Sequence, residues 1–239
     1  MPESFENHDF ADSTFWGVQF RRAAFRDADF SGSTFFHVLL RDVSIDGEIK
    51  NLVVNGVDVT EFVNSHDRWW PLRSNLTPDS VDGLVESWTA LAREWSALLD
   101  RVASADPVVV SKSINGEWTL SETLRHLVFA MDKWFTMPIL RKQTYSAIGL
   151  PNSSAQQRSW PGLDPSAKPS FAEILATRAA QHEVFGGFVS MMNLENLPES
   201  VSVEENGDVP TIMCFHVVLE EEFEHLRYMI RDMAELGLD

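Results

Sequence analysis

The stretch from Met213 to Arg231, MCFHVVLEEEFEHLRYMIR, combines the periodicity of a helix with a group of polar side chains that metals favour. Apolar residues recur in it at three- and four-residue steps, which places their side chains on one face of a helix. These residues are Phe215, Leu219, Phe223, Leu226, Ile230 and Met233. The pattern predicts an amphipathic helix over about 210–236 whose apolar stripe packs against a core.

Beside this stripe lie Glu221, Glu222 and His225. A carboxylate three or four residues before a histidine lies on nearly the same face of a helix, so such a pair can bind a divalent cation. Zinc-like ions usually take three protein ligands and leave one position for water or substrate. The pair therefore requires a third ligand from elsewhere in the chain.

Length and charge limit the classes of protein that the sequence can represent. The chain has 239 residues, 44% of them hydrophobic, which suffices for one large or two small domains with buried cores. Its formal net charge of -17 argues against nucleic-acid partners and acidic membrane surfaces, because both require clustered Lys and Arg. No apolar run approaches the roughly 20 residues of a membrane-spanning helix.

Cysteine content and the N-terminus indicate the cellular compartment. The single cysteine, Cys214, cannot form a disulfide within the chain. The N-terminus lacks the basic and apolar regions of a signal peptide. We therefore expect a soluble, cytoplasmic protein.

The first quarter of the chain repeats with a period of five residues. The aromatic positions are Phe10, Phe15, Phe20, Phe25, Phe30 and Phe35, followed in phase by Leu40 and Ile45. From Phe15 onward a smaller residue lies two positions before each of them. Neither a helix nor a strand has this period, whereas stacked turns that bury one column of side chains do. The pattern predicts a solenoid.

These residues resemble a pentapeptide-repeat domain over about 8–62, which implies a short right-handed β-helix. That family includes DNA-mimicking inhibitors of topoisomerases. About three coils are short for the mimic of a long duplex, so we favour a structural or partner-docking role over DNA mimicry for this part of the chain.

Three further helices are predicted from apolar periodicity and capping signals. Capping boxes occur at Thr119 to Glu122 and at Ser170 to Glu173, so a helix is expected to begin at each. The proline-rich segment 144–169 is expected to shape a substrate pocket. The four predicted helices cover about 78–103, 119–138, 170–192 and 210–236. Long loops between them favour a four-helix bundle with at least one crossover.

The expected architecture is therefore of the α+β class with two domains. A β-helix is predicted over 1–63 and a four-helix bundle over 78–239. The stretch 64–77 between them, with Trp69, Trp70 and Pro71, is interpreted as a linker without regular structure.

The stretches Gly116 to Leu127 (GEWTLSETLRHL) and His216 to Tyr228 (HVVLEEEFEHLRY) resemble the DinB/YfiT superfamily, and the resemblance spans about 78–236. It implies a four-helix bundle in which a histidine after the tryptophan motif supplies one metal ligand. The last helix supplies two more, four residues apart. In a branch similar to mycothiol-dependent isomerases and transferases, the first of these two can be glutamate. The implied activity is metal-assisted thiol transfer, isomerisation or hydrolysis.

His126 matches the first ligand of that family, whereas the last helix can be aligned in more than one way. If Leu219 and Glu220 set the alignment, the pair is Glu221 and His225, and a complete three-ligand site results. The residue sequence of the motif favours this alignment.

If Arg227 sets the alignment, the pair is Glu222 and position 226, where this chain has Leu226. A ligand is then missing. The helical wheel favours this second alignment, because Glu222 and Leu226 lie nearer to the apolar stripe. A third pair, Glu222 and His225, also flanks the stripe, so all three assignments stay open.

Two functions are compatible with these patterns. The leading hypothesis is a metal-dependent enzyme in which His126, Glu221 or Glu222, and His225 hold a zinc-like or nickel-like ion. The ion would activate water or a low-molecular-weight thiol such as mycothiol, the thiol being suggested by the resemblance alone, for reaction with a small-molecule substrate.

The alternative is a non-catalytic protein whose metal site has degenerated at Leu226 and whose solenoid docks a protein partner. In that case His126 is a hydrogen-bonded core histidine and His225 pairs with a neighbouring glutamate. No nucleic-acid or membrane partner is expected in either case. The sequence leaves open a homodimer through either part of the chain.

Overall fold

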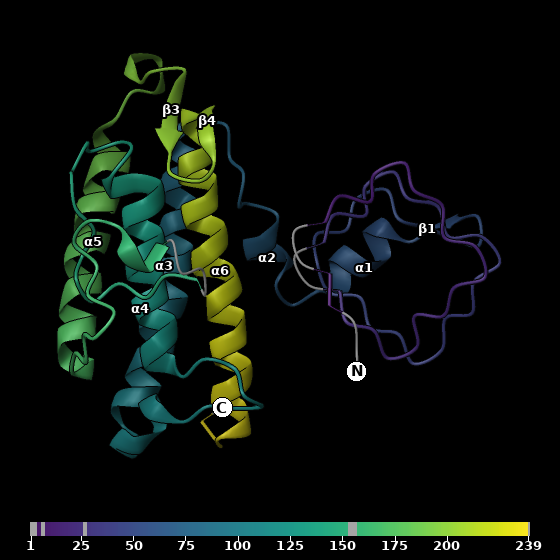
Figure 1. The fold of residues 1–239 in the computed structure, drawn as a ribbon, viewed down its shortest axis with the longest axis horizontal. Helices are drawn as coiled ribbons and strands as arrows, with labels where there is room; N and C mark the ends of the chain where they lie inside the picture. Colours follow the sequence, from purple (N-terminus) through teal and green to yellow (C-terminus); the bar gives the residue numbers. More distant parts are fainter. Residues whose placement is uncertain (1–3, 6–7, 26–27, 153–156, 239) are drawn as a thin grey trace. The chain divides into compact units, whose positions relative to one another are not determined.

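The computed structural model describes residues 4–5, 8–25, 28–152 and 157–238. The chain forms two compact units, unit 1 over Met1–Gly47 and unit 2 over Glu48–Asp239 (Figure 1). The domain boundaries predicted at 63 and 78 stay a prediction. Within the described part of the chain, no helix has both the length and the apolar character needed to cross a membrane.

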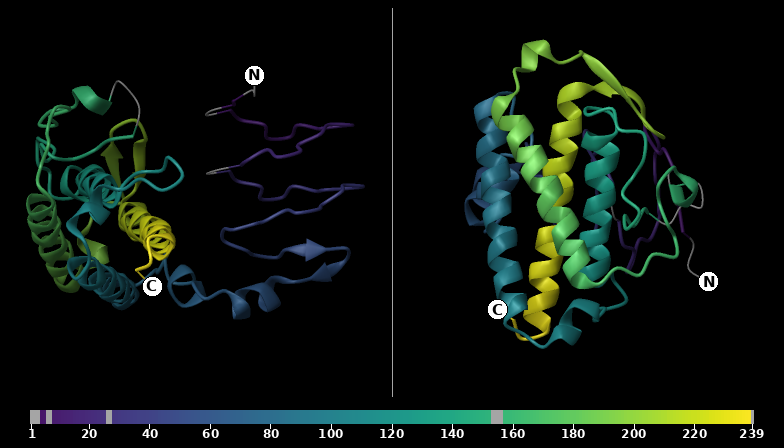
Figure 2. Two further views of the ribbon diagram at one scale, coloured as in Figure 1. Left: turned by 90° about the horizontal axis from the view of Figure 1, so that it is seen from below. Right: turned by 90° about the vertical axis from the view of Figure 1, so that its left-hand side faces the viewer.

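Four long helices that run side by side form the core of unit 2 (Figure 2). They are α3 (Val81–Ala103), α4 (Leu120–Met131), α5 (Phe171–Met191) and α6 (Thr211–Glu235). The apolar stripe of α6 is buried, with Phe215, Leu219 and Phe223 each 0% exposed. All four helices predicted from the sequence are confirmed, because each presents one apolar face to the shared core.

Capping boxes fix where two of these helices begin. At α4, Thr119 Oγ1 accepts from the backbone N–H of Glu122, and the Glu122 carboxylate accepts from the backbone N–H of Thr119. Ser170 and Glu173 make the same reciprocal pair before α5. Both capping boxes are as predicted. After Met131 the chain of α4 continues through a π-helical turn, η2 (Asp132–Thr136).

The stretch interpreted as an irregular linker contains short helices. α1 (Thr60–His66) extends into the first residues of the stretch 64–77, and α2 (Trp70–Arg73) lies within that stretch. Asp67 joins them, because its carboxylate accepts from the backbone N–H of Trp69 and from Nε of Arg73. The expectation that this stretch lacks regular structure was wrong, whereas its role as a linker stays a prediction. Helices of one or two turns are too short for apolar periodicity to reveal.

Two small hairpins complete the regular structure of the described residues. The strands β1 (Val53–Val54) and β2 (Val57–Asp58) pair across an Asn-Gly turn, and β3 (Ser200–Val203) pairs antiparallel with β4 (Gly207–Pro210). β4 leads directly into α6, so the second hairpin precedes the helix that carries most candidate ligands. Short 3₁₀ helices lie at Pro107–Ser111 (η1), Gln157–Ser159 (η3) and Leu194–Asn196 (η4).

The β-helix predicted for the first part of the chain is wrong, and so is the α+β class. Among the described residues of unit 1 there is no strand, and the hydrogen bonds between backbone groups are isolated turns such as Ser13 N–H to Phe10 O. The repeating phenylalanines touch in series, with ring centroids 5.4–5.9 Å apart from Phe10 to Phe35.

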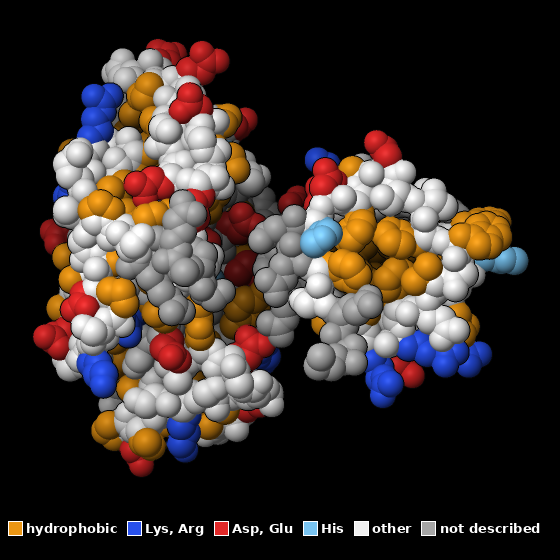
Figure 3. Space-filling model, in the orientation of Figure 1, with side chains coloured by type: hydrophobic (Ala, Val, Ile, Leu, Met, Phe, Trp, Pro, Cys, Tyr) orange, Lys and Arg blue, Asp and Glu red, His pale blue; other side chains and the backbone are white. Residues whose placement is uncertain are grey.

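These rings stay 46–63% exposed instead of forming a buried column, and hydrophobic side chains are visible on the surface of unit 1 (Figure 3). The phenylalanines at five-residue steps thus contact one another, and turns recur along this part of the chain. Among the described residues of unit 1, however, there is no ladder of hydrogen bonds between strands. The described part of the protein is mostly helical with two small antiparallel sheets.

Candidate metal centre

Two helices bring three of the predicted ligands together. His126 comes from α4, and Glu221 and His225 come from successive turns of α6. One possible ligand atom from each residue lies within 4.8 Å of the others, and no other such group occurs among the described residues. His126 Nε2 lies 3.3 Å from Glu221 Oε2. The structure therefore assembles the group that the first alignment of the sequence names.

The donor set fits a tetrahedral divalent ion. Ligand bonds of about 2.0–2.1 Å at tetrahedral angles separate neighbouring ligand atoms by about 3.3–3.4 Å. The distance from His126 Nε2 to Glu221 Oε2, 3.3 Å, has this value. Two imidazoles and one carboxylate are also a donor set that zinc accepts, with a fourth position left for water or substrate.

Hydrogen bonds fix the tautomer of both imidazoles. His126 Nδ1 lies 3.1 Å from the carbonyl oxygen of Leu150, so it carries a proton and donates it. His225 Nδ1 lies 2.8 Å from the carbonyl oxygen of Glu221 and donates in the same way. In the neutral rings both Nε2 atoms therefore keep a lone pair that is free for a metal.

One side of the centre is open to solvent. The His126 side chain is 5% exposed, whereas those of Glu221 and His225 are 27% and 17% exposed. Trp118 lies against the two imidazoles, with its ring centroid 4.9 Å from that of His126 and 6.5 Å from that of His225. Trp118 itself is 36% exposed, so its ring lies between the centre and solvent.

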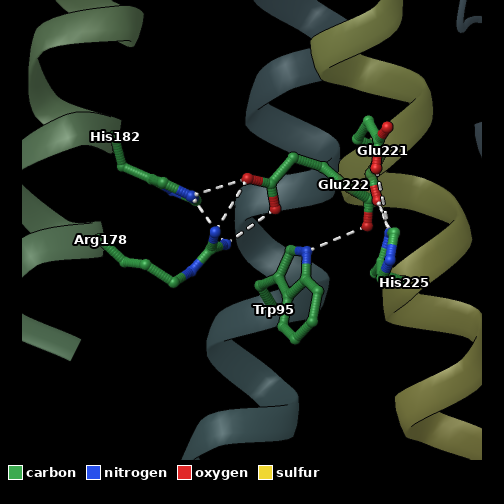
Figure 4. A network of polar contacts seen from close by, with 6 residues as sticks. All are labelled: Trp95, Arg178, His182, Glu221, Glu222 and His225. Carbon is green, nitrogen blue, oxygen red and sulfur yellow. Dashed lines mark hydrogen bonds and ion pairs between the residues drawn. The ribbon is translucent and has the colours of Figure 1, made fainter. Parts of the chain in front are cut away.

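The fourth predicted residue, Glu222, lies outside this group. Its carboxylate accepts from both terminal nitrogens of Arg178 on α5, at 3.1 and 2.8 Å, and lies 3.3 Å from His182 Nε2 (Figure 4). Leu226, the position that replaces a ligand in the second alignment, is 0% exposed and packs in the core. The structure therefore does not bring Glu222 and position 226 to the centre.

Comparison with known protein families identifies the family of the chain. The family model described as the DinB superfamily matches residues 90–229, which is more than half of the chain. The chain belongs to the DinB superfamily. This is a metal-binding helical family, and the match covers His126, Glu221 and His225. It does not reach the first 89 residues, and nothing supports a pentapeptide-repeat domain there. No curated protein and no solved structure matches the chain.

Two of the three candidate ligands of the DinB centre have shifted pKa values. Burial acts to raise the pKa of Glu221, but the hydrogen bond and the charge of His126 outweigh it and lower that pKa. Burial lowers the pKa of His225, and the charge of His126 lowers it further. Near neutral pH Glu221 is therefore a carboxylate and His225 a neutral imidazole, the states in which these two side chains bind a metal.

Three groups beside the DinB centre were not predicted from the sequence: Trp118, the carbonyl of Leu150, and Arg178. Two of them left a signal: Trp118 is the tryptophan of the motif that precedes His126, and Arg178 occupies a position in the buried stripe of α5 between Ile174 and Phe185. An arginine in such a stripe requires a buried counter-charge. The Leu150 contact agrees with the expectation that segment 144–169 adjoins the site, although residues 153–156 of that segment lie outside the described residues.

Proposed function

We propose that this member of the DinB superfamily is a metal-dependent enzyme in which His126, Glu221 and His225 hold one divalent ion, zinc or nickel. One observation carries the proposal: His126 Nε2 on α4 faces Glu221 Oε2 on α6 at 3.3 Å, while Nδ1 of the same ring donates to Leu150 O. The lone pair of Nε2 and the carboxylate of Glu221 repel each other at this distance, so a cation must lie between them. That cation is either a proton carried by His126 Nε2 or a metal ion.

The open side of the centre suits a reacting molecule. A bound zinc or nickel ion would lower the pKa of a coordinated water or thiol, so that a nucleophile is available near neutral pH. Glu221 would offset part of the positive charge of the ion. Trp118 would exclude water from one side, and Leu150 would hold the His126 ring in orientation.

We further propose a low-molecular-weight thiol such as mycothiol as one reactant and a small molecule as the other. The support is the similarity of the glutamate-containing motif on the last helix to mycothiol-dependent isomerases and transferases. The reaction would be thiol transfer or isomerisation, and hydrolysis if water takes the place of the thiol. The cytoplasm would supply such a thiol.

Metal content tests the ligand set. The chain, purified without an affinity tag and reconstituted separately with zinc and nickel, is expected to hold about one equivalent by elemental analysis. His126→Ala and His225→Ala should each hold much less. His216→Gln is the matched control, because His216 lies on the same helix but bonds the carbonyl of Pro78. No metal in the parent, or equal loss in His216→Gln, contradicts the proposal.

A cobalt-substituted sample tests the thiol. A thiol that binds the ion directly gives a sulfur-to-cobalt charge-transfer absorption, which should saturate with mycothiol at lower concentration than with glutathione. The band should be absent from the His126→Ala variant. A metal-loaded parent that shows no such band with either thiol would remove the thiol from the proposal and leave hydrolysis as the reaction to be assayed.

A further inference from the structure

A buried ion pair joins α5 to α6 at the residue next to Glu221. Arg178 donates from Nη1 to Oε1 of Glu222 at 3.1 Å and from Nη2 to Oε2 at 2.8 Å. The two side chains are only 6% and 2% exposed. Figure 4 shows this pair on one side of α6, while Glu221 and His225 lie on another side of the same helix. The proposed ligand set uses neither member of the pair.

A second contact holds the backbone of the same glutamate. Nε1–H of Trp95 on α3 donates to the carbonyl oxygen of Glu222 at 3.2 Å, and the guanidinium of Arg178 lies 5.3 Å from the centre of the Trp95 ring. Glu222 is thus held through its carboxylate and through its backbone, from two different helices. Both contacts oppose rotation of α6 about its own axis.

Stability alone does not explain why charged side chains occupy these positions. The cost of removing two charges from water offsets most of the attraction within a buried pair, and apolar side chains of similar size are often as stabilising. A forked guanidinium differs from an apolar side chain in fixing direction, because its two parallel hydrogen bonds allow one orientation of the carboxylate. The pair therefore adds a fixed orientation of the Glu222 carboxylate relative to Arg178.

The rotation of α6 matters at the metal centre. Successive side chains of a helix point about 100° apart, so the direction of Glu222 sets the direction of Glu221. Side-chain ends lie about 5–6 Å from the helix axis, so a rotation of roughly 20° would move the Glu221 carboxylate by about 2 Å. That displacement is as long as a metal–ligand bond. It would separate Glu221 from His126.

We propose that Arg178 is a positioning residue for the metal centre. Through Glu222 it fixes the rotation of α6 and so holds Glu221 and His225 toward His126. This role rests on the proposed metal site. Groups that orient ligands typically change metal affinity by about 10- to 100-fold when they are removed.

The affinity of the full chain for zinc, measured by competition with a chromophoric chelator, tests this role. The double variant R178M/E222M replaces the ion pair by two apolar side chains and keeps the packing, so its folding stability should stay close to that of the parent. Its zinc affinity should fall by about tenfold or more. If the pair served folding stability alone, a double variant as stable as the parent would also bind zinc as tightly as the parent. Parental zinc affinity in R178M/E222M would therefore overturn the proposal.

Two further variants keep the test decisive. Arg178→Lys keeps the charge but loses the fork, and it should also bind zinc about tenfold more weakly. Parental affinity in R178K overturns the proposal even if the double variant does not fold. Glu183→Gln is the matched control, because Glu183 lies on α5 at an exposed position. It should bind zinc as the parent does, and equal weakening in E183Q would also overturn the proposal. A parent that binds no zinc contradicts the proposed function instead.

Discussion

At the scale of single residues, Glu221 and Glu222 show how one step along a helix separates two roles. They are chemically identical and adjacent. Glu221 faces a histidine and keeps 27% of its side chain exposed, whereas Glu222 is 2% exposed and faces Arg178. The sequence shows only that both lie near the apolar stripe of α6. What distinguishes them is the side chain that each meets on a neighbouring helix.

The ion pair of Glu222 should make stability depend on acid pH. Burial acts to raise the pKa of Glu222, but Arg178 and His182 outweigh it and lower that pKa from 4.5 to about 2. Because the folded-state pKa lies below the unfolded one, the contribution is fully present above about pH 4.5 and is lost as pH falls toward 2. Its size is about 3 kcal/mol.

Urea denaturation of metal-free protein at several pH values measures this contribution. Glu222→Gln should be less stable than the parent by about 3 kcal/mol at neutral pH, and the difference should shrink as pH falls below the unfolded-state pKa. Glu183→Gln, at an exposed position of α5, is the control and should show little difference at any pH. A difference between parent and Glu222→Gln that is independent of pH would rule out this account.

At the scale of elements, the sequence predicted what local chemistry decides. Thr119 and Ser170 each bond a residue three positions away, so their capping boxes can be recognised from spacing alone. The partner of Glu222 is Arg178, 44 residues away, and no local pattern connects them. The helical wheel identified Glu222 as close to the core correctly. It could not show that an arginine from α5 meets it there.

The cap of α4 should affect both stability and metal binding. Thr119→Ala removes the side chain that accepts from Glu122 N–H, so α4 should lose about 1 kcal/mol and fray at its first turns. His126 lies seven residues after Thr119 on that helix. We therefore expect lower stability in urea denaturation together with weaker zinc binding by chelator competition.

Ser80→Ala separates the two effects. It removes the side chain that accepts from Gly83 N–H at the start of α3, a helix that carries none of the three proposed ligands, and should cost a similar about 1 kcal/mol while zinc affinity changes little. Unchanged stability in Thr119→Ala would refute the capping argument. Equal loss of zinc affinity in both variants would show that affinity follows global stability rather than the start of α4.

At the scale of the whole molecule, sequence periodicity was least informative in unit 1. The five-residue spacing of Phe10 to Phe35 accompanies a regular series of ring contacts, but regular spacing does not specify which backbone groups hydrogen-bond. The rings are half exposed, so this part lacks the buried column on which the β-helix prediction depended. In unit 2 the amphipathic helices bury their stripes against one another, and there sequence pattern and structure agree.

This division predicts that unit 2 binds metal by itself. The three proposed ligands, Leu150 and the Arg178–Glu222 pair all lie after Gly47. A ligand at 100 times its dissociation constant stabilises the folded state by about 2.7 kcal/mol. Zinc at that excess should therefore raise the melting temperature by several degrees, and by a similar amount in the full chain and in a chain that begins at Glu48. His126→Ala should show almost no shift in either chain. A shift that disappears when residues 1–47 are removed would mean that unit 1 contributes to the metal centre, which contradicts the ligand set proposed here.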